Sequence, residues 1–121
     1  MSEHLEQVAL FDLIRANEAR YPMLAWVFAV PNGGSRHPAV ARKLKAEGVR
    51  RGISDICVPI ARKGYHGAFI EMKYGKNKLT SEQTAFHKFL EDGGYFTATA
   101  YGSQDAQRQI EEYLEIALCK K

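Results

Sequence analysis

The sequence predicts a mixed α/β fold in a single domain that covers residues 1–121. A chain of 121 residues has the usual length of one domain. Its hydrophobic share of 45% and charged share of 26% are typical of a chain that buries a core in water. Segments with apolar residues at helical spacing alternate with short runs of β-branched and aromatic residues. These observations exclude a collagen-like, disordered or coiled-coil protein.

The amino-terminal part of the chain predicts a helix, a strand and a second helix. The first helix is expected over residues 3–19, on a stripe of Leu5, Val8, Ala9 and Leu13 that Leu10 and Ile14 broaden. A strand is expected over residues 24–30, and the turn residues at 31–34 close it. A short basic helix is expected over residues 38–47, with proline in its first turn and Gly48 at its end.

The middle of the chain predicts a β-hairpin. Residues 54–60 and 68–73 are rich in apolar and β-branched side chains, as strands are. Residues 61–67 contain two glycines and would form a longer loop between them. The two strands are therefore expected to pair.

The carboxy-terminal part predicts a helix, a fourth strand and a last helix. Residues 80–83 fit a capping box, which would open a helix that ends near Asp92. Residues 95–101 would form the strand, and Ser103 would cap the last helix. The apolar stripe of that helix is Ala106, Ile110, Tyr113, Leu114 and Ala117. The expected order is α-β-α-β-β-α-β-α.

Composition also restricts the cellular compartment and the cofactors that can be expected. Cys57 and Cys119 are too few for a disulfide framework or a four-cysteine zinc cluster, which favours a reducing cytosol. The longest apolar run, residues 23–31, is too short to span a bilayer, and no secretory signal is visible. No glycine-rich phosphate loop followed by Lys-Ser or Lys-Thr is present. We expect a cytoplasmic protein with no membrane partner and no organic cofactor.

Charge is distributed unevenly along the chain. The formal net charge is only +3, but residues 36–78 contain eleven Lys or Arg against three acids, a local balance of +8. A basic middle between acidic ends is typical of a phosphate-binding surface. Scattered solvated lysines are the alternative, and charge alone does not decide between them.

Two carboxylates in this basic middle form the sharpest pattern. Asp55 is followed sixteen positions later by Glu71, and Lys73 lies two residues beyond. Side chains alternate along a strand, so Glu71 and Lys73 share a face, and the hairpin would bring Asp55 beside Glu71. Adjacent ionised carboxylates repel unless a divalent cation lies between them, and oxygen ligands suit Mg²⁺ or Mn²⁺. An exposed Glu71–Lys73 pair on an edge strand is the alternative interpretation.

This pattern resembles the PD-(D/E)xK nuclease superfamily, in which a central hairpin displays Asp…Glu-x-Lys. Residues 49–52, Val-Arg-Arg-Gly, look like the signature of the VRR-NUC family, whose small stand-alone members occur in bacteriophages. Residues 31–34 and 65–67 also resemble that family, and the similarity runs from about residue 3 to residue 114. One departure is Ser54, which stands where the superfamily has the proline of its Pro-Asp pair.

The resemblance implies a restriction-endonuclease-like α-β-β-β-α-β core with a mixed sheet flanked by helices. It also implies that Asp55 and Glu71 bind the metal ion, that the backbone carbonyl of Met72 adds an oxygen, and that Lys73 is the catalytic lysine. Lys73 would orient the attacking oxygen or offset charge on the phosphate.

Two further site residues are implied by the resemblance. Many superfamily members add a glutamate from the first helix, for which Glu3 and Glu6 are candidates and Glu3 is preferred. An acid in a first helical turn also needs no functional explanation. Gln83 matches a glutamine near the catalytic centre of relatives, although it already has a structural role in the capping box.

The basic residues are expected to contact DNA. Arg50 and Arg51 precede the metal-binding strand and are the candidate phosphate ligands. Generic backbone contacts or plain surface positions are expected for Arg36, Arg42, Lys43, Lys45, Lys76 and Lys78.

Together these residues predict a Mg²⁺- or Mn²⁺-dependent endonuclease that acts on DNA, in the host cytoplasm if a phage encodes it. Small VRR-NUC members look like Holliday-junction resolvases, and a junction requires two symmetric incisions. One chain has room for one metal site, so we expect a C2 homodimer, with the last helix and the fourth strand as candidate surfaces. The alternatives are a non-catalytic nucleic-acid-binding module of the same fold and a monomeric nickase or flap nuclease.

Overall fold

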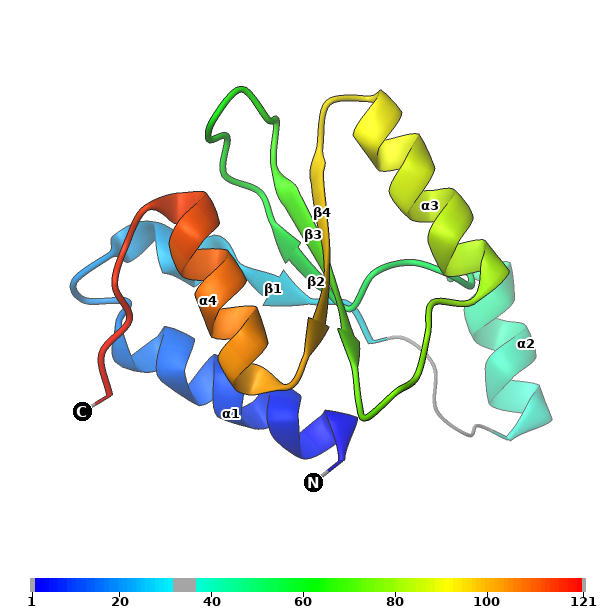
Figure 1. Cartoon of the computed structure of the whole chain (residues 1–121). Helices are drawn as coiled ribbons and strands as arrows, with labels where there is room; N and C mark the ends of the chain where they lie inside the picture. The colour runs from blue at the N-terminus through cyan, green and yellow to red at the C-terminus, as the bar shows by residue number, and fades with distance from the viewer. Residues whose placement is uncertain (1, 32–36, 121) are drawn as a thin grey trace.

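A four-stranded sheet forms the centre of the molecule, as the mixed α/β prediction requires (Figure 1). The structure is a computed structural model that describes residues 2–31 and 37–120. The strands are β1 (Phe28–Ala29), β2 (Ile56–Val58), β3 (Ala68–Lys73) and β4 (Phe96–Tyr101), side by side in that order. β1, β2 and β3 pair antiparallel, whereas β3 and β4 are parallel.

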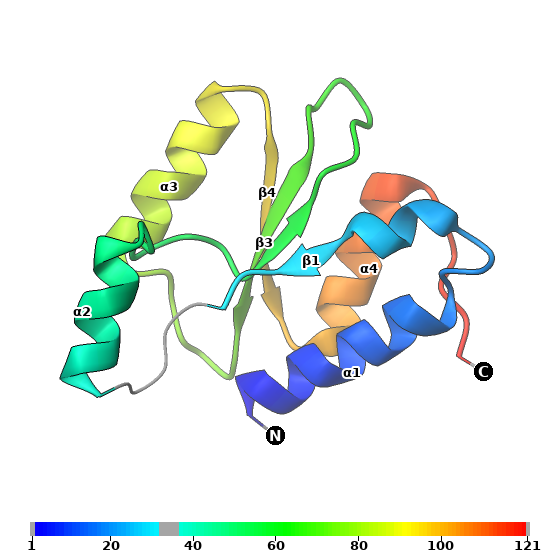
Figure 2. The same ribbon diagram turned by 180° about the vertical axis from the view of Figure 1, so that it is seen from behind.

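Helices cover both faces of this sheet (Figures 1 and 2). α1 (Glu3–Ala16) and α4 (Ser103–Leu114) pack together against one face. α3 (Ser81–Asp92) lies over the other face, where its Phe86 packs edge-on against Phe69 of β3. α2 (Pro38–Ala46) buries none of its residues. Among the described residues, no helix has the length and apolar character needed to cross a bilayer.

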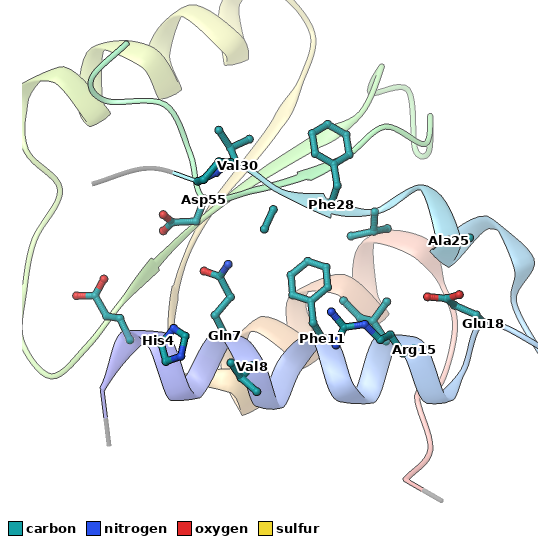
Figure 3. Close-up of a pocket in the computed structure, with 15 residues that line it drawn as sticks. His4, Gln7, Val8, Phe11, Arg15, Glu18, Ala25, Phe28, Val30 and Asp55 are labelled. Atoms are coloured by element: carbon teal, nitrogen blue, oxygen red, sulfur yellow. The ribbon is translucent and has the colours of Figure 1, made fainter. Parts of the chain in front are cut away.

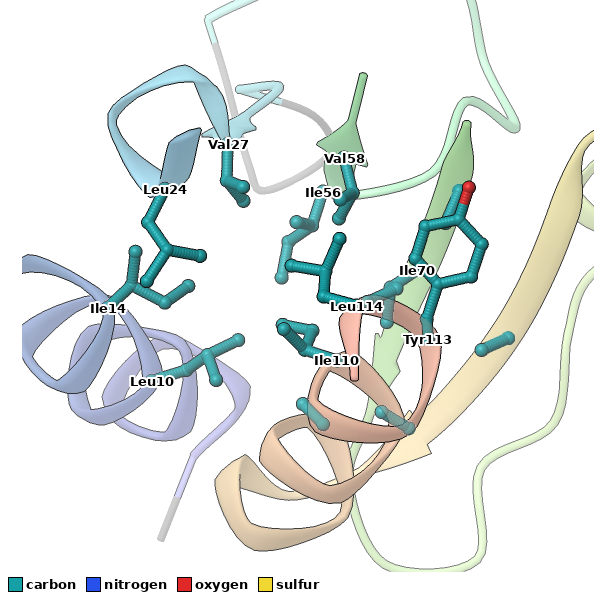
Figure 4. Packing of buried hydrophobic residues seen from close by; sticks show 14 of the residues in the cluster. Leu10, Ile14, Leu24, Val27, Ile56, Val58, Ile70, Ile110, Tyr113 and Leu114 are labelled. Carbon is teal, nitrogen blue, oxygen red and sulfur yellow. The ribbon is translucent and has the colours of Figure 1, made fainter. Parts of the chain in front are cut away.

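The hydrophobic core lies between the sheet and the α1–α4 pair (Figure 4). Ile70 and Met72 alternate along β3 and point into this layer, which α1 and α4 close from the other side. Burial of these side chains is the main source of stability for the fold. The central members of the layer are Leu10, Ile14, Ile56, Val58, Ile70, Met72, Ile110 and Leu114.

The predicted strand over residues 24–30 is wrong for most of its length. Pro22–Trp26 forms a 3₁₀ helix, η1, and only Phe28–Ala29 is extended. The buried side chains here are Leu24 and Val27, which lie three positions apart. That spacing matches one turn of 3₁₀ helix. The fixed φ angle of Pro22 suits the first residue of a helix.

The predicted apolar stripe of the first helix is also wrong at its amino-terminal end. Leu5 and Val8 are 52% and 42% exposed, while Leu10 and Ile14 are buried. Helical spacing extends the line of Leu10 and Ile14 back to two polar residues, the half-buried Gln7 and the exposed Glu3. Hydrophobicity alone therefore assigns the wrong face of the first two turns of α1 to the protein interior. The helix also ends at Ala16 rather than at residue 19.

The hairpin and the third helix agree with prediction. The strand predicted over 68–73 is β3 as observed, and β2 pairs with it antiparallel, although β2 is shorter than the predicted 54–60. The capping box is present, because Thr80 accepts from the Gln83 backbone and Gln83 accepts from the Thr80 backbone.

The start of the last helix differs from prediction by one residue. Ser103 is the first residue of α4 rather than its cap. Gly102 occupies the cap position, and it has no side chain that could accept a capping hydrogen bond. The backbone N–H of Ser103 instead donates to Oε1 of Glu6, at 2.7 Å. Ala117 lies beyond the end of the helix at Leu114.

Candidate active site

Asp55 and Glu71 lie across from each other where β2 begins. The pairing of Ile56 with Ile70 places Asp55, one residue earlier, opposite Glu71. Oδ2 of Asp55 accepts a 2.8 Å hydrogen bond from the Met72 backbone, which fixes this carboxylate against β3. The antiparallel hairpin thus brings together two acids that lie sixteen positions apart in sequence.

The Glu71 carboxyl group is electrostatically unfavourable as a free anion. Burial raises the pKa of Glu71 to about 9, and its hydrogen bond with Asp55 and the charges of Asp55 and Glu3 act in the same direction. Lys73 acts in the opposite direction. Oε1 of Glu71 is buried and is without a hydrogen-bond partner in the described part of the chain. A buried acceptor next to a second carboxylate fits a cation as its missing partner.

Any cation site here relies on few protein side chains. Within residues 2–31 and 37–120, no three His, Cys, Asp or Glu side chains converge into a metal-binding group. Two carboxylates with backbone and water oxygens suit Mg²⁺, which usually retains several waters in proteins. The donors are all oxygen, which fits Mg²⁺ or Mn²⁺.

Lys73 and Gln83 approach Glu71 from different elements. Lys73 follows on the same face of β3 and is nearly buried. Gln83, in the first turn of α3, donates from Nε2 to Oε2 of Glu71 at 3.2 Å, while its Oε1 serves the capping box with Thr80. Gln83 therefore contacts the site and caps the helix at once.

The two candidate glutamates of α1, Glu3 and Glu6, have different surroundings. Glu6 accepts from the Ser103 N–H, which holds the pKa of Glu6 below its usual value. Glu3 lines a groove that it shares with Asp55, and its charge acts on Glu71. Figure 3 shows Asp55 pointing into this groove toward the first turns of α1, where His4 and Gln7 lie. Glu3 is the α1 glutamate on the side of the site.

Two residues at the site were not found by sequence reasoning. The Ser54 hydroxyl, buried next to Asp55, lies 3.2 Å from Nε2 of the buried His87 on α3. The available signal was the position of His87 four residues after Gln83, which places both on one helix face.

The predicted phosphate contacts are on the surface. Arg50 and Arg51 are exposed in the segment between α2 and β2, Lys43 is exposed on α2, and Lys76 is exposed after β3. No carboxylate of the described residues forms an ion pair with any of them. Arg36 lies outside the described residues, as does most of the predicted turn at 31–34.

Comparison with known proteins identifies one family. The model of the VRR-NUC domain matches residues 1–104. A solved structure described as a VRR_NUC domain protein superposes with a TM-score of 0.77 at 24% identity, covering 97% of this chain and 91% of the other. No curated protein matches. The shared fold agrees with the restriction-endonuclease-like core that the sequence motifs imply.

Proposed function

The chain belongs to the VRR-NUC domain family, a nuclease family, and from this premise we propose that it is a divalent-metal-dependent endonuclease that hydrolyses DNA phosphodiester bonds. The observation that supports the proposal best is the buried Glu71 oxygen without a partner, directly beside Asp55. Burying this unpartnered oxygen beside a second carboxylate costs free energy, and a bound cation would offset that cost.

The metal-binding residues would be Asp55, Glu71 and the backbone carbonyl of Met72. Glu3 of α1 lines the same groove but does not converge with the two carboxylates among the described residues, so it would act through bound water. All four positions supply oxygen, and Mg²⁺ or Mn²⁺ is the expected ion. When bound, such an ion acts as a Lewis acid on the phosphate and makes water a stronger nucleophile.

The remaining site residues orient these groups. Gln83 binds Oε2 of Glu71, which leaves Oε1, buried and without a partner among the described residues, available to a cation. The Lys73 ammonium group stands on the same strand face as Glu71, where it can orient the attacking oxygen or offset charge on the phosphate. Gln83 is a positioning residue, and Lys73 is the proposed catalytic lysine.

DNA would be held mainly by charge. Arg50 and Arg51 lie before β2, and no acid of the described residues pairs with them, so they can contact phosphates close to Asp55. Lys43 and Lys76 would add backbone contacts, and Arg36 stays a proposal outside the described residues.

We further propose that the substrate is branched DNA, such as a Holliday junction, and that two chains act as a C2 homodimer. Two symmetric incisions require two sites related by a two-fold axis. The surfaces expected from sequence offer little for this contact. The apolar side chains of α4 are buried within the chain, and the edge of β4 is partly occupied, because Tyr101 donates to Asp105 and Gln109 donates to the Thr99 carbonyl.

Cleavage of a supercoiled plasmid and of a four-way junction in Mg²⁺, Mn²⁺, Ca²⁺ or chelator tests the chemistry. We expect cleavage with Mg²⁺ and Mn²⁺, binding without cleavage in Ca²⁺, and no cleavage by Asp55→Asn. Asp92→Asn changes an exposed acid on α3 and serves as the matched control. Undiminished cleavage by Asp55→Asn in chelator contradicts the proposed site.

Sedimentation and a panel of DNA structures test the substrate and the assembly. A dimer at micromolar concentration that cuts junctions in preference to linear duplex supports the resolvase proposal. A monomer that cuts both equally favours a nickase or flap nuclease with the same active site. DNA binding without cleavage under any metal condition favours a non-catalytic module.

A further inference from the structure

The segment that leads into β2 is held against α3 by a buried hydrogen bond. Ser54 is fully buried, and its Oγ lies 3.2 Å from Nε2 of His87. His87 is itself only 7% exposed. Burying a hydroxyl group without a partner costs free energy, so the imidazole satisfies a group that the fold has removed from water.

Gly52 makes a second contact between this segment and α3. Its φ of +82° lies in the left-handed region, and a Cβ placed on it would lie 2.7 Å from Cβ of Glu82. Glu82 is the second residue of α3. Only glycine permits both this backbone conformation and this approach. The chain just before Asp55 therefore rests directly on the first turn of the helix.

The same helix also holds the second carboxylate. Gln83 donates to Oε2 of Glu71, and His87 follows it by four residues. Residues at this spacing share one face of a helix. One face of α3 thus contacts both parts of the carboxylate pair, directly at Glu71 on β3 and through Ser54 at the residue before Asp55.

We propose that His87 is a positioning residue that acts on Asp55 through Ser54. By fixing Asp55 at a set separation from Glu71, the Ser54–His87 bond determines how tightly the carboxylate pair binds a divalent cation. This inference rests on the proposed metal-dependent function of that pair. A proline at position 54, as in the superfamily pattern, would restrict the backbone covalently. In this chain the hydrogen bond from α3 supplies the restraint.

Calorimetric titration of Mn²⁺ into the metal-free protein, in the absence of DNA, tests the inference. Ser54→Ala and His87→Leu are each expected to weaken Mn²⁺ binding by about 10-fold, the scale on which groups that orient metal ligands act. The double variant should be no weaker than either single one, because both remove the same bond. His87→Gln retains a side-chain amide and should recover most of the affinity.

Two controls separate positioning from loss of structure. Lys88→Ala changes an exposed side chain on the same helix and should keep the wild-type affinity. In cleavage assays the half-saturating Mn²⁺ concentration should rise with the dissociation constant, while kcat at saturating Mn²⁺ stays within about two-fold of wild type. If His87→Leu does not fold, Ser54→Ala, which removes one oxygen atom, carries the test.

The outcomes distinguish this inference from the proposed function. Folded Ser54→Ala protein with wild-type Mn²⁺ affinity overturns the positioning role, and so do additive effects in the double variant. Wild-type protein that binds no Mn²⁺, or Asp55→Asn protein that binds it fully, overturns the proposed function and the inference with it.

Discussion

The two faces of β3 differ in chemistry over its carboxy-terminal half, where residues on both faces are buried. Ile70 and Met72 are 2% and 1% exposed on the face that α1 and α4 cover, and Glu71 is 3% exposed on the other. Burial of the two apolar side chains stabilises the fold by about 25 cal/mol for each Å² removed from water. Burial of the carboxyl group with an unpartnered oxygen opposes folding.

On the proposed function, this difference separates stability from function within one strand. Apolar packing on one face holds β3 in place, and the unfavourable group on the other face is retained at a fixed position. Substitutions on the two faces should therefore produce different defects, and four predictions test that separation.

The largest effect is expected for Glu71→Gln, which should lower kcat by about 1,000-fold, as loss of a charged group at a reaction centre does. The free energy of unfolding of the metal-free protein should rise at neutral pH, because glutamine preserves the shape and removes a carboxyl group whose pKa burial raises to about 9. Cleavage assays and urea denaturation measure the two quantities. A large loss of stability would place Glu71 among the structural residues.

Ile70→Ala should show the reverse pattern. Removing this buried side chain should lower the free energy of unfolding by about 3 kcal/mol. Protein that remains folded should bind Mn²⁺ with wild-type affinity. Val40→Ala, which shortens a half-exposed residue of α2, should cost less than about 0.5 kcal/mol. An Ile70→Ala protein of normal stability but weak Mn²⁺ binding would contradict the separation of the faces.

Replacing Arg50 and Arg51 together with Ala extends the comparison to the surface. Loss of two phosphate contacts should reduce the slope of log affinity against log salt by about 1.8 for duplex DNA. Stability should be unaffected. Arg108→Ala is the control, because Arg108 already pairs with Asp105 and Glu112 on α4. An unchanged slope for the double variant would make these arginines ordinary surface residues.

The smallest effect is expected in the pH dependence of stability at His87. Burial lowers the pKa of His87 below its ordinary value of 6.5, while Glu91, which lines a neighbouring pocket together with Lys88, acts in the opposite direction. As the pH falls through about 6.5, the unfolded chain takes up a proton that folded His87 does not, so stability decreases. The decrease ends below the folded pKa.

Urea denaturation between pH 7.5 and pH 5 measures this effect against His87→Gln. The other titratable groups are the same in both proteins, so the variant should lose less stability on acidification. Parallel curves for the two proteins would show that His87 titrates normally in the folded state.

The sequence predicts best what is local to it. The residues of β3, the capping box at Thr80 and the pairing of the hairpin all follow from patterns within a few residues, and the structure agrees with them. The position of Asp55 opposite Glu71 follows from the hairpin alone.

What could not be predicted depends on packing between distant segments. In the first two turns of α1, the residues in line with Leu10 and Ile14 are the polar Glu3 and Gln7, which line the groove at Asp55, so a search for an apolar stripe does not find them. The hydrogen bond from the Ser103 backbone at the start of α4 to Glu6 joins residues 97 positions apart. The contact of Ser54 with His87 joins residues 33 positions apart. No local propensity encodes either contact, because each one requires the assembled sheet.

The double use of the Gln83 amide has a consequence for the behaviour of the protein on warming. Helix ends open more easily than the rest of a fold, and the first turn of α3 depends on the bond between Gln83 and Thr80. When that turn frays, the amide that holds Glu71 leaves with it. The cleavage rate should therefore begin to fall at temperatures where the hydrophobic core is still intact. The temperature optimum of cleavage would then be set by fraying of the first turn of α3 rather than by global unfolding.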